Sequence, residues 1–141
     1  MTRRILLLFI VAAVLAVDIQ AQARIQVIVR GEAGKDGWAD PSSGLAASAR
    51  DLSKHVASTS RKWIGPATSD TSAHVRVEIV ERHMEDAGEV HVVTARGTVG
   101  DYQQPFAGRS DSNWRDAALN IAKQIDAWAF ANRERILATR H

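Results

Sequence analysis

The side chains with the clearest capacity for chemistry are two histidines and two glutamates in the segment 83–91. His83 and His91 flank a short loop, with Glu85 and Glu89 beside them. Two imidazoles and a carboxylate form a ligand set for zinc or copper. One hypothesis is therefore a small metal-binding or ligand-binding protein, or a metal-dependent enzyme, with its site at this position.

The alternative is a solvated hairpin tip, whose polar side chains keep the strand ends from aggregating. We favour this interpretation and expect neither a metal nor another cofactor. Without a metal, protonation would put two imidazolium groups side by side, because the expected strand register places His83 opposite His91. We therefore expect the tip to loosen in acid.

The expected register follows from the alternation of apolar and polar residues in the segments 74–83 and 89–99. The two segments form a hairpin if Glu85 pairs with Glu89, because Gly88 then takes the left-handed conformation that a three-residue loop needs. A slip of one residue would bury arginine and expose valine. The predicted pairs are Val75 with Val99, Val77 with Gly97, Glu78 with Arg96, Ile79 with Ala95, Glu81 with Val93 and His83 with His91.

The other elements extend and cover this hairpin. The segment 24–30 alternates as a half-buried strand, and a helix begins at Asp40-Pro41 and ends at Gly65-Pro66. A short edge strand is expected over 102–109. A final helix follows, with Asp111 or Ser112 as its cap.

This order of elements predicts an α+β fold, namely a two-layer β-α-β-β-α sandwich in which both helices cover one face of a small mixed sheet. The other face is expected to be polar and solvated. The residues expected there are Gln26, Arg30, Arg76, Glu78, Arg82 and Arg96.

The final helix carries a second apolar stripe in addition to the one that faces the core. Leu119, Phe130 and Leu137 lie about 160 to 180° from Ile121 around the helix, which is the far side. Large apolar residues there predict a partner-binding surface, for a homo-oligomer or for an envelope protein. The alternative is that they are ordinary exposed residues, or that the first helix and the loops cover them.

The composition excludes several classes of function. The chain has 141 residues, no cysteine, and no Gly-x-Ser-x-Gly or complete phosphate-loop motif. Its 18 basic and 16 acidic residues leave a net charge of +2, and no basic block is longer than a dipeptide, so nucleic acid is not an expected partner. We interpret the protein as a non-enzymatic module that acts by protein contact.

The amino terminus has the pattern of an export signal. Arg3 and Arg4 precede an apolar run over 5–17, and Ala21 and Ala23 supply the small residues that signal peptidase requires. The run is too short to cross a hydrocarbon core of about 30 Å. We expect cleavage of residues 1–23 and a single domain over 24–141, periplasmic or secreted, with no stable membrane anchor after cleavage.

The element order, and Ala73-His74 ahead of an alternating strand, resemble small periplasmic accessory domains. The similar families are the amino-terminal domain of TolB, the activator lipoproteins of penicillin-binding proteins and the curli secretion lipoproteins. These families often have Ala-Asp where this chain has Ala73-His74, and the lipoprotein members carry an anchoring cysteine that is absent here. The resemblance implies a non-enzymatic envelope module that docks on protein partners, and it assigns no binding residue.

Overall fold

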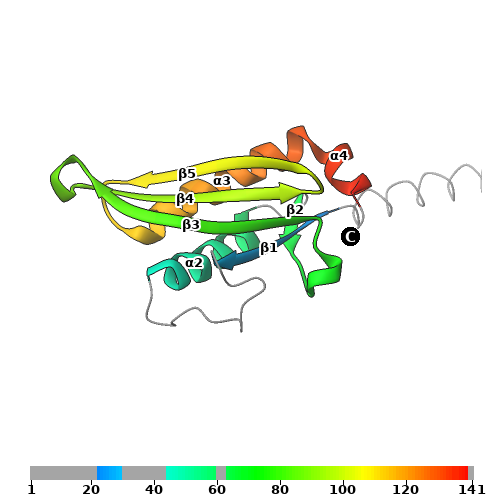
Figure 1. The fold of residues 1–141 in the computed structure, drawn as a ribbon, viewed down its shortest axis with the longest axis horizontal. Coiled ribbons are helices and arrows are strands. Elements are labelled where there is room, and N and C mark those ends of the chain that lie inside the picture. Colours follow the sequence, from blue (N-terminus) through cyan, green and yellow to red (C-terminus); the bar gives the residue numbers. More distant parts are fainter. Residues whose placement is uncertain (1–21, 30–43, 60–62, 140–141) are drawn as a thin grey trace, which may run out of the picture.

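Five strands form one mixed sheet in the order β2-β1-β3-β4-β5 (Figure 1). The computed structural model describes residues 22–29, 44–59 and 63–139. The predicted signal segment up to residue 21, the start expected for the first helix at Asp40-Pro41, and Arg30 lie outside the described residues. The strands are β1 (Ala23–Val29), β2 (Ile64–Pro66), β3 (Val75–Glu85), β4 (Val90–Val99) and β5 (Tyr102–Ser110).

The strand directions follow the predicted crossover and hairpin. β1 runs parallel to both β2 and β3, whereas β3, β4 and β5 are successively antiparallel. The α+β class and the mixed sheet are therefore confirmed. Two features differ from the expectation. Gly65-Pro66 belongs to the short edge strand β2 instead of only ending a helix, and β5 is a full nine-residue strand.

Three helices are described: α2 (Gly44–Thr59), α3 (Trp114–Ala131) and α4 (Arg133–Ala138). α2 packs on β1, β2 and β3, α3 packs on β4 and β5, and the two helices contact each other (Figure 1). The cap of α3 is Asn113, whose Oδ1 accepts a hydrogen bond from the Asp116 N–H at 2.7 Å, so the predicted Asp111 or Ser112 cap is wrong. The predicted single final helix is divided at Asn132.

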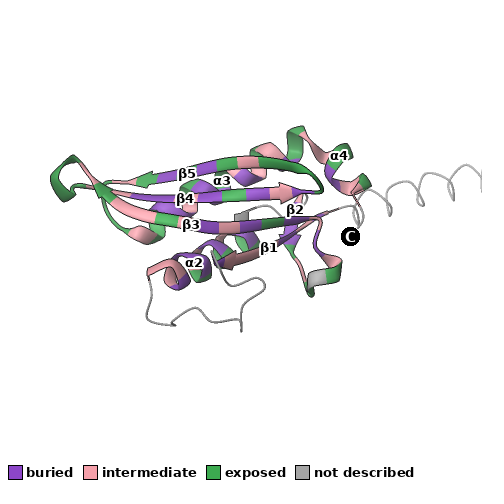
Figure 2. Ribbon diagram, viewed as in Figure 1, coloured by how far each residue is buried: buried purple, intermediate pink, exposed green. Residues whose placement is uncertain are grey.

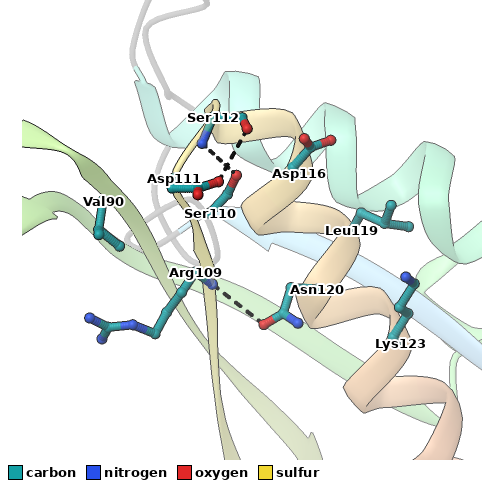
Figure 3. A pocket seen from close by; sticks show the side chains of 9 residues that line it. All are labelled: Val90, Arg109, Ser110, Asp111, Ser112, Asp116, Leu119, Asn120 and Lys123. Carbon is teal, nitrogen blue, oxygen red and sulfur yellow. Dashed lines mark hydrogen bonds between the residues drawn. The ribbon is translucent and has the colours of Figure 1, made fainter.

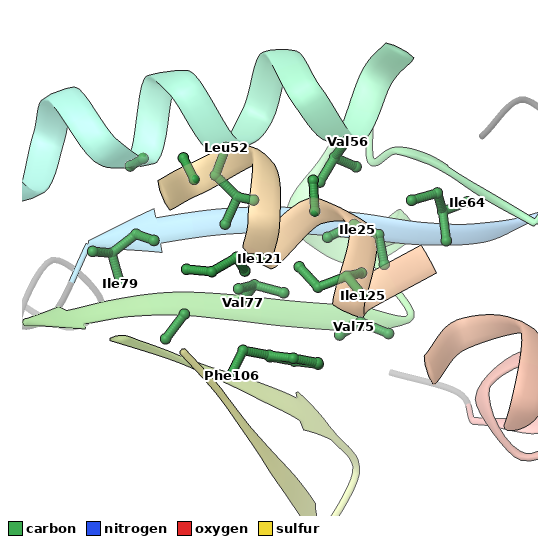
Figure 4. Packing of buried hydrophobic residues seen from close by; sticks show 14 of the residues in the cluster. Ile25, Leu52, Val56, Ile64, Val75, Val77, Ile79, Phe106, Ile121 and Ile125 are labelled. Carbon is green, nitrogen blue, oxygen red and sulfur yellow. The ribbon is translucent and has the colours of Figure 1, made fainter. Parts of the chain in front are cut away.

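The core lies between the helices and the sheet (Figures 2 and 4). Its largest fully buried side chains include Leu52, Ile121 and Ile125 from the helices and Val77 and Ile79 from β3. β5 and α3 approach closely at Gly108, where a Cβ would overlap the carbonyl oxygen of Ala117. Glycine at this position is therefore a packing requirement.

The predicted hairpin register is confirmed as far as Ile79 opposite Ala95 and is wrong beyond that pair. A bulge at Val80 shifts the pairing, so that Glu81 lies opposite Thr94 and Glu85 opposite Val90. A regular strand would have carried Glu81, His83 and Glu85 to the helix side, where burial of carboxylates is unfavourable. The extra residue returns these side chains to the uncovered face.

Candidate functional site

The two histidines at the hairpin end are not neighbours. His83 lies opposite Val92, and His91 lies opposite Met84. Adjacent residues of a strand point to opposite faces, so His83 and His91 lie on opposite faces of the sheet. The predicted pair is therefore wrong, and it no longer gives a reason for the tip to loosen in acid. Within the described residues, no group of three or more potential ligands is arranged to hold a metal ion.

His83 belongs to a charged cluster on the uncovered face, formed with Glu81, Glu85 and Arg109. The His83 Nδ1 lies 2.8 Å from Glu81 Oε1, and its Nε2 lies 3.1 Å from Glu85 Oε1. The Arg109 guanidinium of β5 reaches across β4 to pair with the other Glu85 oxygen. The cluster covers Val92, which is only 2% exposed although it faces away from the helices.

The protonation states in this cluster follow from its geometry. The hydrogen bond to Glu85, supported by Glu81, raises the pKa of His83 above its ordinary value. The hydrogen bond from Arg109, with a contribution from His83, lowers the pKa of Glu85. Both shifts favour the charged forms of His83 and Glu85. The Nε2 of His83 lies at hydrogen-bond distance from Glu85, whereas its Nδ1 lies within ion-pair distance of Glu81 without hydrogen-bond geometry.

The helix side of the same hairpin end holds a second cluster, around Trp114 at the start of α3. The bulge places Arg82 on this side, so the prediction that Arg82 faces solvent is wrong. Its guanidinium lies 4.0 Å from the Trp114 ring centroid, and its Nη1 donates to the Ser48 hydroxyl at 3.5 Å. His91 meets the same ring edge-to-face at 4.7 Å. These contacts anchor the hairpin to α2 and α3.

The predicted partner-binding residues are divided between two places. Leu119 is half-buried and lines an open groove of about 510 Å³ between α3 and the end of β5 (Figure 3). Phe130, on α3, is 55% exposed, and Leu137 is half-buried on α4, beyond the break at Asn132. The stripe is therefore not one continuous surface, and only Phe130 presents most of a large apolar side chain to solvent.

Phe130 is held in place by the ring of Trp63. Its ring meets Trp63 at a centroid distance of 4.6 Å and an interplanar angle of 62°. Trp63 packs against the core between α2 and β2, and the guanidinium of Arg133 lies 5.0 Å from its ring centroid. Arg133 also lines an open hollow of about 390 Å³ beside Phe130. We call Trp63, Phe130 and Arg133 the aromatic corner.

Sequence reasoning placed Phe130 at the surface but missed its two neighbours. Trp63 falls within the segment predicted to form the first helix, and it instead lies after α2 has ended. Arg133 gave no signal beyond its favourable charge near the end of the last helix. The sequence could not place either residue beside Phe130, because their proximity depends on how α2 packs beside α3.

Comparisons with known proteins give a weak similarity of architecture and no family. No protein-family model matches the chain, and no curated sequence is significantly similar to it. A ribosomal subunit interface protein from Coxiella burnetii is similar at 13% identity and a TM-score of 0.39, over 79% of this chain and 98% of that chain. A PelC dodecamer structure from Paraburkholderia phytofirmans is similar at 14% identity and a TM-score of 0.39, over 75% of this chain and 87% of that chain. Neither is a TolB or penicillin-binding-protein activator structure.

Proposed function

We propose that this protein is an exported, non-enzymatic module of the cell envelope that acts by protein contact, and that the aromatic corner is its contact surface. The observation that carries the proposal is the exposure of Phe130. It is the most exposed large hydrophobic residue of the described chain, at 55%, although its ring is fixed against Trp63.

The composition of the corner suits a protein interface. Tryptophan and arginine are enriched among the residues that contribute most to binding energy, and aromatic residues are enriched at interface centres. The edge-to-face contact with Trp63 and the Arg133 guanidinium over Trp63 restrict the rotamers of these side chains before binding. A partner that covers Phe130 then gains apolar burial at a small cost in side-chain entropy.

The contact is tested by Phe130→Glu, with Ala127→Glu as the matched control, because Ala127 is exposed one turn earlier on α3. Native mass spectrometry of the purified chain, and crosslinking in the cells that produce it, report a second copy or an envelope protein from the adduct mass. We expect Phe130→Glu to abolish the adduct and Ala127→Glu to retain it. Equal adducts from wild type and both variants would contradict the proposal.

Export rests on the amino-terminal sequence and has its own test. Ala23 begins β1 and its N–H donates to the Trp63 carbonyl oxygen at 2.9 Å, whereas the Arg24 N–H donates to His74 Nδ1 at 2.9 Å. Cleavage after Ala23 would remove the first bond and place the new amino group at His74. We expect amino-terminal sequencing of the exported product to begin at Arg24. A product that keeps residues 1–23 and stays in the cytoplasm would contradict export.

The structure describes no helix that is long and apolar enough to span a membrane. The pairing of His83 with His91 that a metal site required is not formed. We therefore do not propose a metal-dependent activity.

A further inference from the structure

β5 is the longer of the two edge strands of the sheet, and an edge strand presents unpaired backbone groups to which another strand can add. The groups that point away from β4 can be identified from the register. Pro105, Ala107 and Arg109 lie opposite Arg96, Thr94 and Val92. Pro105 has no N–H and cannot donate to β4, so its position is one at which the backbone groups point away from β4. Backbone groups alternate in direction along an antiparallel strand, so those of Ala107 and Arg109 point outward as well.

Two amide side chains of α3 bond to these outward groups. Gln124 Nε2 donates to the Ala107 carbonyl oxygen at 2.7 Å. The Arg109 N–H donates to Asn120 Oδ1 at 3.4 Å (Figure 3). Gln124 Nε2 also donates to Asn120 Oδ1 at 3.0 Å, which links the two amides one helical turn apart. A backbone peptide group of a neighbouring strand would offer the same pair, one donor and one acceptor.

A further outward position, Pro105, is blocked within β5 itself. Pro105 offers no donor, and its carbonyl oxygen accepts a hydrogen bond from Gln104 Nε2 at 3.3 Å. Over the outward positions from Pro105 to Arg109, the Pro105 and Ala107 carbonyl oxygens and the Arg109 N–H therefore have intramolecular partners, and Pro105 has no N–H, whereas the Ala107 N–H also faces outward. The opposite edge needs less protection, because β2 has three residues and ends in Pro66.

We propose that Asn120 and Gln124 form an amide clamp that keeps β5 from adding a strand, and that the strand it excludes is β5 of a second copy of this chain. An antiparallel pair of β5 strands about Ala107 would join the two sheets into one. The clamp is independent of the aromatic corner. Because it blocks the edge of the sheet, other proteins are left to contact surfaces that side chains form.

The test is the double variant Asn120→Ala, Gln124→Ala, compared with Lys123→Ala, which removes another exposed side chain of α3 without a bond to β5. Sedimentation analysis over a concentration series measures mass, and amide exchange measures the protection of Arg109. We expect the double variant to associate further than wild type, roughly doubling its mass at high concentration, whereas Lys123→Ala matches wild type. An unchanged mass for a folded double variant would overturn the proposal.

A third substitution identifies the route of association. Ala107→Pro removes an outward N–H without breaking a bond to β4, as Pro105 already does. Added to the double variant, it should return the mass to the wild-type value. Association that persists in the triple variant would show that the strands do not pair through β5, and it would also overturn the proposal.

Discussion

The two ends of this molecule present opposite kinds of surface. At the hairpin end, Glu81, His83, Glu85 and Arg109 bond to one another over Val92, so the charges are paired and the valine beneath them is covered. At the aromatic corner, Phe130 is fixed by one neighbouring ring and remains more than half exposed.

This difference indicates where a partner would gain the most binding free energy. A partner at the hairpin end would have to remove water from charges that already have partners. Solvent-exposed ion pairs of this kind contribute little to binding affinity. A partner at the aromatic corner would bury apolar surface, worth about 25 cal/mol per Å² of area removed from water. The proposed function therefore rests on the contrast between charges that already have partners and an apolar ring that remains exposed.

The largest expected effect comes from disturbing the contact between α3 and β5. Gly108→Ala places a Cβ against the Ala117 carbonyl oxygen and should push α3 away from β5. We expect a loss of about 3 kcal/mol of unfolding free energy, measured by chemical denaturation. Gly97→Ala is the control, because its Cβ would approach the Phe106 ring at 3.0 Å and would otherwise lie at ordinary contact distances of 3.7 Å from Gln104 and Val75. A cost for Gly108→Ala no larger than that for Gly97→Ala would contradict the close approach of α3 and β5.

An intermediate effect is expected from removing the support of Phe130 while leaving Phe130 in place. Trp63→Ala deletes the ring that fixes Phe130 and should cost about 2 kcal/mol of stability. It should also weaken partner contact several-fold, because Phe130 is no longer pre-ordered. Trp63→Phe, which keeps an aromatic ring, should retain most of the contact. If both variants bind as wild type does, the support of Phe130 has no role in recognition.

The smallest expected effect is a pH dependence at the hairpin end. The raised pKa of His83 gives stability that is complete below its ordinary value of 6.5 and is lost as pH rises through the higher folded value. The lowered pKa of Glu85 gives stability that is present above its ordinary value of 4.5 and is lost as pH falls through the lower folded value. The tip should therefore be most ordered between about pH 4.5 and 6.5.

Amide exchange at residues 83–90 measures this dependence. We expect greater protection at pH 5.5 than at pH 8 after correction for the intrinsic exchange rate, and we expect His83→Gln to remove the difference. Less protection at pH 5.5 in the wild-type chain would show that His83 is not stabilised as the imidazolium by Glu81 and Glu85.

Much of the fold could be predicted because long periodic segments specify it. Alternating Val75, Val77 and Ile79 fixed the first half of the hairpin, and the apolar stripe of the last helix fixed α3. β2 could not be predicted, because its three residues include glycine and proline, which is typical of a segment that ends a helix. Its pairing with β1 is a tertiary effect.

The bulge did leave a signal in the sequence. Polar residues occupy even positions at Arg76 and Glu78 and odd positions at Glu81, His83 and Glu85, so the phase of alternation changes at Val80. This change of phase predicts that His83 and His91 lie on opposite faces of the sheet. The aromatic corner left no such signal, because it depends on Trp63 and Phe130, 67 positions apart in the sequence, meeting where α2 and α3 pack side by side.

The most direct test of the contact surface compares the two ends in one experiment. A photo-crosslinking residue is placed at Phe130 in one chain and at Glu81, whose side chain is 59% exposed, in another, and both are irradiated in the cells that produce the protein. We predict a discrete protein adduct, to a second copy or to an envelope protein, from position 130 and none from position 81. An adduct from position 81 alone would place the contact at the hairpin end and contradict the proposed function.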